Sequence, residues 1–286
     1  MVAYLIRDAL ARRRAVDLTT AAVAEASRSW READASDATV WARLRVLRSA
    51  VGWAWGQHII DIHPLEAMPS TPHVRTRMHA PVDQVRHILD HAEERAAQAR
   101  ACADPVALHK AEQILPLCRL AADSGARRGE LAGLQIDDLD GDVLTICRSA
   151  SSETVGPTKT GRIRRITLGH TTASLWRDSV VIWRGRAAGR PLGPWLFSPQ
   201  PNHRTRLTTS CLGRWFGQVC TESGYPQITL HRLRHTVATA LVSEGHLLQA
   251  QYRLGHKDAA TTLRTYSHVM PLTDADTAAT MDALYR

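Results

Sequence analysis

Four residues near the C-terminus have types and spacing suited to chemistry on a phosphate. His231 and Arg234 are three residues apart in the stretch H-R-L-R-H. Residues three apart on a helix share a face, so an imidazole and a guanidinium would point the same way. His256 follows a leucine–glycine pair, and Tyr266 comes ten residues later. A guanidinium can hold a phosphate, imidazoles can move protons, and a tyrosine hydroxyl can act as a nucleophile.

The first two of these residues lie on a predicted helix. Thr229 is a residue type that caps helix N-termini, and Gly245 is a type that ends helices. The predicted buried face consists of apolar residues at helical spacing, Leu230, Leu233, Val237 and Leu241. His231 and Arg234 are therefore expected at the edge of a core.

Five sequence segments match one family in type and order. H-x-x-R-H, L-G-H and T-L-x-T-Y-S-H follow one another near the C-terminus. Together they resemble the C-terminal signature of the tyrosine recombinase (phage integrase) family. The earlier segments G-x-R-x-x-E-L, with Arg127 and Glu130, and P-x-K-T, with Lys159, also resemble family motifs. The resemblance thus extends over most of the chain.

The resemblance implies a set of six catalytic residues. The family positions Arg, Lys, His, Arg, His and Tyr are filled here by Arg127, Lys159, His231, Arg234, His256 and Tyr266. Tyr266 would attack phosphorus, and the two arginines would stabilise the charge that builds on the nonbridging oxygens. Lys159 on a β-hairpin would protonate the leaving 5′ oxygen. Glu130 would support the site without reacting.

The implied reaction is site-specific cleavage and rejoining of DNA strands through a 3′-phosphotyrosyl intermediate. This bond keeps the phosphodiester energy, so rejoining needs no ATP. We expect no cofactor and no metal, because the histidine-rich segments, which also include His235 and His268, contain no H-E-x-x-H or paired carboxylates. The resemblance implies strand exchange in two steps within a homotetramer on synapsed DNA, from a protein that is monomeric when free.

The pattern of the chain predicts a mainly α-helical protein with a small antiparallel β-sheet. Residues 1–68 are interpreted as a helical core-binding domain that binds DNA, 69–81 as a proline-rich linker, and 82–286 as the catalytic domain. Helical spacing is found in 82–100, 106–123, 170–184 and 212–220, whereas apolar alternation in 143–147 and 163–168 predicts strands around Lys159.

Four arginines are candidates for contacts with the DNA backbone. A helix predicted from Ser36 carries Arg45 and Arg48 on a face away from its apolar stripe. The passage T-V-x-x-R-L-x-V-L-R-S-A-x-x-W-A around them resembles the core-binding domain of the same family. Arg75 and Arg77 lie in the linker, which would pass close to the duplex in a protein that clamps DNA. An ordinary charged surface explains any one of these arginines equally well.

The composition favours an anionic partner, which we take to be double-stranded DNA. The formal net charge is +8, and only three of the 36 basic residues are lysines. The five cysteines show no C-x-x-C pair, which indicates reduced thiols and neither a zinc site nor a disulfide framework. Without a signal-peptide core or a long apolar run, the sequence predicts a cytoplasmic, nucleoid-associated protein with no membrane partner.

Two other functions fit the same segments. One is a catalytically inert DNA-binding protein of this fold, and the other is a type IB topoisomerase, which works as a monomer. The predicted recombinase belongs to a phage or mobile element, with an accessory DNA-bending or directionality factor where the reaction needs one. The first 80 residues leave room for one small helical domain, whereas many phage integrases carry an extra arm-binding domain before it, so the protein is either a simpler recombinase or a chain that is truncated or starts late. The target site and the direction of recombination stay open.

Overall fold

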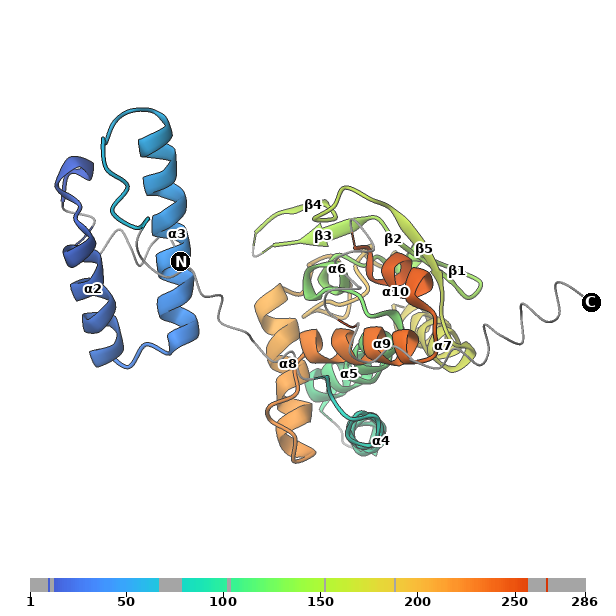
Figure 1. Ribbon diagram of the computed structural model, residues 1–286. Coiled ribbons are helices and arrows are strands. Elements are labelled where there is room, and N and C mark those ends of the chain that lie inside the picture. The colour runs from blue at the N-terminus through green and yellow to red at the C-terminus, as the bar shows by residue number, and fades with distance from the viewer. Residues whose placement is uncertain are drawn as a thin grey trace, which may run out of the picture. The chain divides into compact units, whose positions relative to one another are not determined.

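The computed structural model describes residues 10, 13–66, 79–101, 104–151, 153–187, 189–256 and 266. The chain divides into two compact units, Met1–Thr76 and Arg77–Arg286, and each is described by itself. Helices predominate in the described residues, and the strands form small antiparallel sheets (Figure 1). The predicted fold class is therefore confirmed, except that the strands form two sheets where one was expected.

The first unit is built on two helices, α2 (Thr20–Glu32) and α3 (Asp37–Gly56), which follow the short 3-10 helix η2 (Ala15–Asp17). The side chain of Ser36 accepts a hydrogen bond from the backbone of Thr39, which confirms the helix start predicted there. The predicted apolar stripe of α3 is confirmed as well. The buried apolar side chains among the described residues of the unit are Leu10, Ala22, Val23, Trp30, Val40, Val51, Ala54, Ile60 and Leu65, with Leu44 and Leu47 packed against them.

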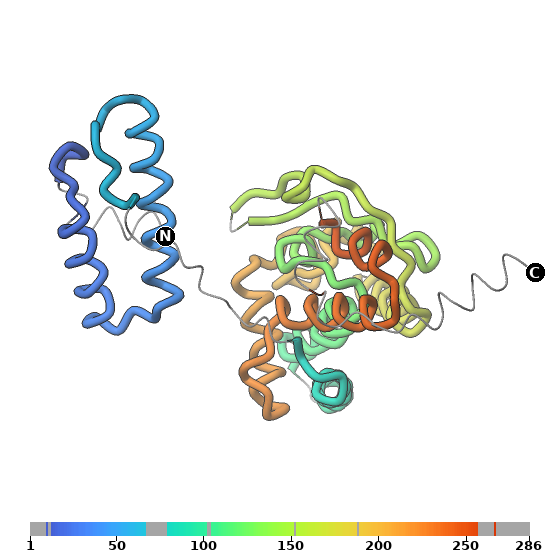
Figure 2. The backbone as a smooth tube through the Cα atoms, in the orientation of Figure 1, coloured from blue at the N-terminus to red at the C-terminus, as the bar shows by residue number. Residues whose placement is uncertain are grey.

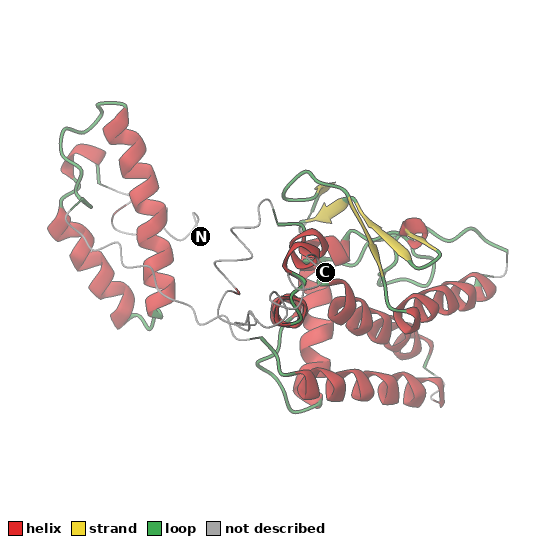
Figure 3. Cartoon of the chain, turned by 45° about the vertical axis from the view of Figure 1, so that its right-hand side comes forward, coloured by secondary structure: helices red, strands yellow, loops and turns green. Residues whose placement is uncertain are grey.

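The second unit is organised around α5 (Pro105–Ser124), which packs against four longer helices of the unit. These are α4 (Val82–Ala101), α7 (His170–Arg186), α8 (Thr209–Glu222) and α9 (Leu230–Ser243). Gly125 ends α5 in the left-handed conformation, just beyond the stretch 106–123 for which helical spacing predicted a helix. Figure 3 shows the strands gathered along one side of this unit, with most of the helices on the other.

The strands lie beside the C-terminal helix of the described chain. A three-stranded sheet has the order β1 (Leu139–Asp140), β2 (Val143–Ile146), β5 (Arg164–Thr167), and Leu144 faces Ile166 across it. A two-stranded sheet pairs β3 (Arg148–Ala150) with β4 (Val155–Pro157). The helix α10 (Leu247–Leu254) packs against β5 and α9, as the tube in Figure 2 also shows.

The predicted helix after Thr229 is confirmed, but its buried face is wider than expected. The side chain of Thr229 caps α9 by accepting a hydrogen bond from the backbone of Arg232. Leu230 and Leu233 are buried as predicted, whereas Val237 and Leu241 are only partly buried. Because α9 is packed by α5 and by α10, the buried arc also takes in residues outside the predicted stripe, namely Arg234, His235, Ala238 and Val242.

Two short elements connect the helical core to the strands. α6 (Arg128–Ala132) follows the Gly125 turn and packs against β3, and η3 (Ile136–Asp138) leads into β1. Most of the predicted linker, with Arg75 and Arg77, lies outside the described residues, as do residues 267–286. The proposed boundaries at residues 68 and 81 therefore stay predictions.

Gly129 in α6 fits against β3 only because it lacks a side chain. A Cβ atom there would lie 2.6 Å from Ser149 Oγ and 2.7 Å from the Ala150 carbonyl oxygen. We predict that Gly129→Ala lowers the free energy of unfolding by about 1–3 kcal/mol, because α6 or β3 must shift. Urea denaturation measures this change.

Gly217→Ala is the matched control, since Gly217 lies within α8 and a Cβ there meets nothing within 4 Å. This variant should be neutral or slightly more stable, because alanine favours a helix over glycine. Equal unfolding free energies for the two variants would contradict the tight packing of α6 on β3.

A buried histidine lies beneath α7 with one ring nitrogen bonded and the other not. His203 Nδ1 donates to the carbonyl oxygen of Trp195 at 2.8 Å, while Nε2 has no partner in the described part of the protein. Burial lowers the pKa of His203 to about 4, and the neighbouring His109 lowers it further. Protonation of His203 would therefore place an unpaired N–H in the core.

This burial makes stability depend on pH. The pKa of histidine is 6.5 in the unfolded chain and about 4 at His203 in the folded protein, so the unfolded state binds more protons between these values. We predict that stability from this group is complete above pH 6.5 and declines as the pH falls, by on the order of 1–2 kcal/mol at pH 5. His203 has a φ of 53°, which asparagine tolerates, so His203→Asn is the matched variant. Urea denaturation should show a smaller decline between pH 7.5 and pH 5 in this variant, and an equal decline would contradict the assignment.

Candidate active site

The turn between α5 and α6 places Arg127 and Glu130 in contact. The Glu130 carboxylate accepts the backbone N–H of Arg127 at 2.7 Å and its Nη1 at 2.9 Å. Arg127 is the N-cap of α6 and Glu130 is its third residue. The side chain of Glu130 thus caps the helix by accepting the N–H of Arg127, as acidic residues at this position commonly do. The two residues of the G-x-R-x-x-E-L segment are therefore directly paired.

A third charged residue, Arg164 on β5, completes this cluster and was not predicted. Its Nη1 and Nη2 donate to the two oxygens of Glu130 at 3.1 Å and 2.6 Å, in a bidentate pair. Arg164 and Glu130 have side-chain exposures of 3% and 0%. The alternating pattern of β5 could have predicted that Arg164 is buried, because Arg164 lies on the same inward face as Ile166. An arginine that points into a core needs a buried carboxylate.

Glu130 stays ionised in spite of its burial. Burial alone raises the pKa of this carboxyl, but the hydrogen bonds and charge of Arg164, together with Arg127, bring the pKa below its ordinary value. Arg234 approaches the same group, so three guanidinium groups surround one carboxylate. The cluster therefore carries an excess of positive charge, which suits an anion such as a phosphate.

Arg234 is held by the backbone turns at the ends of two helices. Its Nη1 donates to the Gly125 carbonyl oxygen at 2.7 Å and its Nη2 to the Leu254 carbonyl oxygen at 2.6 Å. Burial lowers the pKa of Arg234 to about 9, and the charge of Arg127 contributes to this, so the group is still cationic at neutral pH. These two bonds fix the guanidinium before any ligand arrives.

The turn after α10 requires glycine. Gly255 has a φ of 64°, and a Cβ atom there would lie 3.0 Å from Nη1 of Arg164. Its carbonyl oxygen accepts a hydrogen bond from Arg127 Nη2 at 3.2 Å. The leucine–glycine pair of the L-G-H segment therefore anchors Arg127 and Arg234 through its backbone.

Tyr266 lies next to α9, and its hydroxyl contacts the side chain of His235. Its ring is buried among apolar side chains of α9 and α10, including Ala238 and Leu254. The hydroxyl forms a hydrogen bond with Nδ1 of His235. Nε2 of His235 lies 3.1 Å from Nε2 of His231, whose side chain is exposed. His235 was not in the predicted set, although its spacing of four residues from His231 was a signal for contact.

The other two predicted residues lie at the edge of the cluster or apart from it. His256 is half buried directly after α10 and lines a pocket with Arg164 and Tyr252. Lys159 is exposed in the turn between β4 and β5. No hydrogen bond or ion pair links Lys159 to the candidate residues within the described ranges. The structure thus brings together Arg127, Glu130, His231, Arg234 and Tyr266 but not Lys159.

The two described DNA-binding candidates differ in their surroundings. Arg45 is exposed, with its guanidinium carbon 5.3 Å from the centre of the Trp41 ring. Arg48 is half buried and donates to the Leu65 carbonyl oxygen at 3.4 Å, which ties α3 to the segment after it. Arg75 and Arg77 lie outside the described residues.

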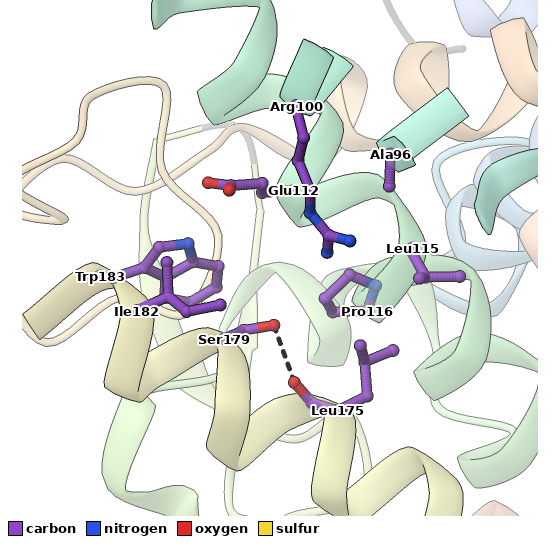
Figure 4. Close-up of a pocket in the computed structure, with 9 residues that line it drawn as sticks. All are labelled: Ala96, Arg100, Glu112, Leu115, Pro116, Leu175, Ser179, Ile182 and Trp183. Carbon is purple, nitrogen blue, oxygen red and sulfur yellow. Dashed lines mark hydrogen bonds between the residues drawn. The ribbon is translucent and has the colours of Figure 1, made fainter. Parts of the chain in front are cut away.

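A separate pocket between α4, α5 and α7 shares no residue with the arginine cluster (Figure 4). Arg100, Glu112 and Trp183 are among the residues that line it, and Ser179 Oγ donates to the Leu175 carbonyl oxygen at 2.7 Å. In the described part of the chain, no three His, Cys, Asp or Glu side chains gather as metal ligands would. None of the described helices is long and apolar enough to span a membrane.

Comparison with known proteins identifies the family. The sequence matches the Phage integrase family over residues 77–272. It is 29% identical over 253 residues to tyrosine recombinase XerC of Mycobacterium sp. (strain KMS), an alignment that covers 85% of this chain and 77% of that protein. Tyrosine recombinase XerD of Brucella suis biovar 1 is 27% identical over 192 residues, which covers 66% of this chain and 58% of that protein. The chain belongs to the phage integrase family of tyrosine recombinases, as its motifs predicted.

Solved structures share the fold. The Tn1549 transposon integrase in complex with a circular intermediate DNA has a TM-score of 0.74 and 20% identity, with 98% of this chain and 90% of that chain covered. A lambda integrase dimer bound to a COC′ core site has a TM-score of 0.62 and 19% identity, with coverage of 88% and 80%. At these identities the likeness concerns the fold.

We predict that removing the charge of Glu130 destabilises the second unit. Glu130→Gln keeps the shape of the side chain but leaves the buried Arg164 without a counter-charge, which should cost about 3–5 kcal/mol of unfolding free energy. The exposed pair of Asp137 with Arg184 provides the control, and Asp137→Asn should cost less than about 1 kcal/mol. Chemical denaturation measures the unfolding free energy of both variants. A cost for Glu130→Gln as small as that of the control would show that the cluster does not depend on this carboxylate.

Proposed function

We propose that this protein is a site-specific DNA recombinase that cleaves and rejoins strands through a phosphodiester bond to Tyr266. The observation that carries the proposal is the placement of the Tyr266 hydroxyl at His235, beside the buried cation Arg234. A tyrosine hydroxyl attacks a phosphodiester poorly unless neighbouring groups take its proton and stabilise the added negative charge. Both kinds of group lie next to Tyr266.

The two arginines of the motifs bind the scissile phosphate in this proposal. Arg127 and Arg234 are fixed by Glu130 and by the backbone carbonyl groups of Gly125, Leu254 and Gly255. Donors that are oriented beforehand stabilise a transition state better than water, because they need no reorganisation as the charge develops. His231 and His256 can add hydrogen bonds to the phosphate oxygens in this proposal.

Lys159 protonates the leaving 5′ oxygen, which makes it the general acid. Its place on an exposed turn requires the β4–β5 segment to approach the bound DNA before cleavage. The product is a 3′-phosphotyrosyl bond and a 5′ hydroxyl. Attack by the 5′ hydroxyl of another strand completes the exchange without ATP or a metal ion.

The proposed partner is double-stranded DNA. The net charge of +8 suits a polyanion, and the Tn1549 and lambda integrases with the same fold were solved with DNA. Residues 1–68 would form the core-binding domain, with exposed Arg45 as a backbone contact and with Arg48, Arg75 and Arg77 as further candidates. A homotetramer on synapsed DNA, a monomer in free solution and a nucleoid-associated location belong to the same proposal.

The nucleophile can be tested with nicked duplexes that carry candidate attachment sites from the genomic neighbourhood. A nick beside the cleavage site releases a short strand, so the covalent complex accumulates instead of being rejoined. We predict a detergent-stable protein–DNA adduct that is lost in Tyr266→Phe, which lacks the attacking oxygen. The control is Tyr252→Phe. Tyr252 lies near the cluster, but its hydroxyl accepts a hydrogen bond from the Arg165 backbone, so the variant should still form the adduct.

Other results would point to the alternative functions. Specific binding of a site without any adduct would indicate an inert DNA-binding protein. An adduct that persists in Tyr266→Phe would contradict the proposed nucleophile. Adduct formation by a protein that relaxes supercoils and stays monomeric on DNA would indicate a topoisomerase.

A further inference from the structure

Two imidazole rings connect the Tyr266 hydroxyl to the protein surface. His235 Nδ1 is hydrogen bonded to the hydroxyl, and His235 Nε2 lies 3.1 Å from Nε2 of His231. The two rings lie edge to face, with centroids 4.5 Å apart. His235 is buried, whereas His231 is exposed one turn earlier on α9. A continuous line of three groups thus leads from the buried oxygen to solvent.

The hydrogen bonds restrict where the protons can be. A neutral imidazole has one nitrogen that donates and one that accepts. If the Tyr266 hydroxyl donates to His235 Nδ1, then His235 Nε2 carries the proton and donates to His231 Nε2. His231 then carries its own proton on Nδ1. Each group in this arrangement donates in the same direction, away from the tyrosine.

We propose that His235 is the base that removes the proton of Tyr266, and that His231 relays a proton from His235 to solvent. This inference rests on the proposed function, since it assigns the proton transfer that accompanies attack by Tyr266. His235 is a catalytic residue in this account, because its ring touches the reacting oxygen. His231 serves as the relay during attack and not as a donor to the phosphate, because its Nε2 accepts from His235 and its Nδ1 proton goes to solvent.

The step balances in atoms and charge. The Tyr266 oxygen forms a bond to phosphorus while the bond from phosphorus to the 5′ oxygen breaks. The phenolic proton moves to His235 Nδ1, the proton on His235 Nε2 moves to His231 Nε2, and the proton on His231 Nδ1 leaves to solvent. The 5′ oxygen takes its proton from Lys159. During rejoining each transfer runs in reverse, and Tyr266 recovers its proton from His235.

The charged groups around the site do not replace His235 as the base. Glu130 accepts hydrogen bonds from Arg164 on both oxygens, so its protonation would break a buried ion pair. Arg127, Arg164 and Arg234 are cations that bring no acceptor.

The first test measures the tautomer of His235 in the free protein. Long-range proton–nitrogen NMR of ¹⁵N-histidine-labelled protein distinguishes the two ring nitrogens, and His235→Gln assigns the signal. The relay predicts at neutral pH an unprotonated Nδ1 and a protonated Nε2. In Tyr266→Phe the Nδ1 signal should shift, because its donor is lost, while the signals of the distant His109 should not move. A protonated Nδ1 at neutral pH, or a doubly protonated ring, would overturn the proposal.

The second test measures the rate of adduct formation in a single turnover on the nicked duplex. His235→Gln keeps a polar side chain but cannot pass a proton along the line. We expect cleavage to slow by about 10²-fold or more, with unchanged DNA affinity, as for the loss of a general base. His235→Gln that cleaves at the wild-type rate would contradict the relay.

The two tests separate the relay from the proposed function. If the wild-type protein forms no Tyr266-dependent adduct, the proposed function fails, and the NMR result still shows whether His235 accepts from Tyr266. If the adduct forms but His235 carries its proton on Nδ1, the proposed function stands and the relay is wrong.

Discussion

The bidentate ion pair between Glu130 and Arg164 is the contact on which the rest of the site depends. It joins α6 to β5 across the unit, and both side chains are almost fully buried. The same carboxylate orients Arg127, while Arg164 also donates through Nε to the Arg253 carbonyl oxygen at 2.9 Å. One glutamate therefore sets the relative positions of the α5–α6 turn, the three-stranded sheet and the end of α10.

The cluster concentrates positive charge where a phosphate would bind. Like charges in a buried site repel each other, and folding must supply the free energy that holds them together. Here the backbone carbonyl groups of Gly125, Leu254 and Gly255 share that task with Glu130. A phosphate would complete the charge balance. Because the guanidinium groups are already held together in the folded protein, they would bind an anion tightly and the transition state more tightly still.

Local patterns predicted the helices and the residues of the motifs, because these depend on neighbours in the chain. The cap at Thr229 follows from its residue type, and the helix over 106–123 follows from the spacing of its apolar residues. The contacts of Arg164 and His235 join residues 34 and 31 positions apart, so only the folded chain brings them together. The wider buried face of α9 has the same origin, since two helices pack against it. Lys159 stays a prediction, because its task depends on bound DNA.

The central claim is that this arrangement makes Tyr266 the residue that becomes joined to DNA. Trapped adduct can be digested with protease and nuclease, and mass spectrometry can then locate the residual nucleotide on a peptide. The account predicts a nucleotide attached through its 3′ phosphate to Tyr266. A nucleotide on Tyr252 or another residue, or one attached through a 5′ phosphate, would contradict it.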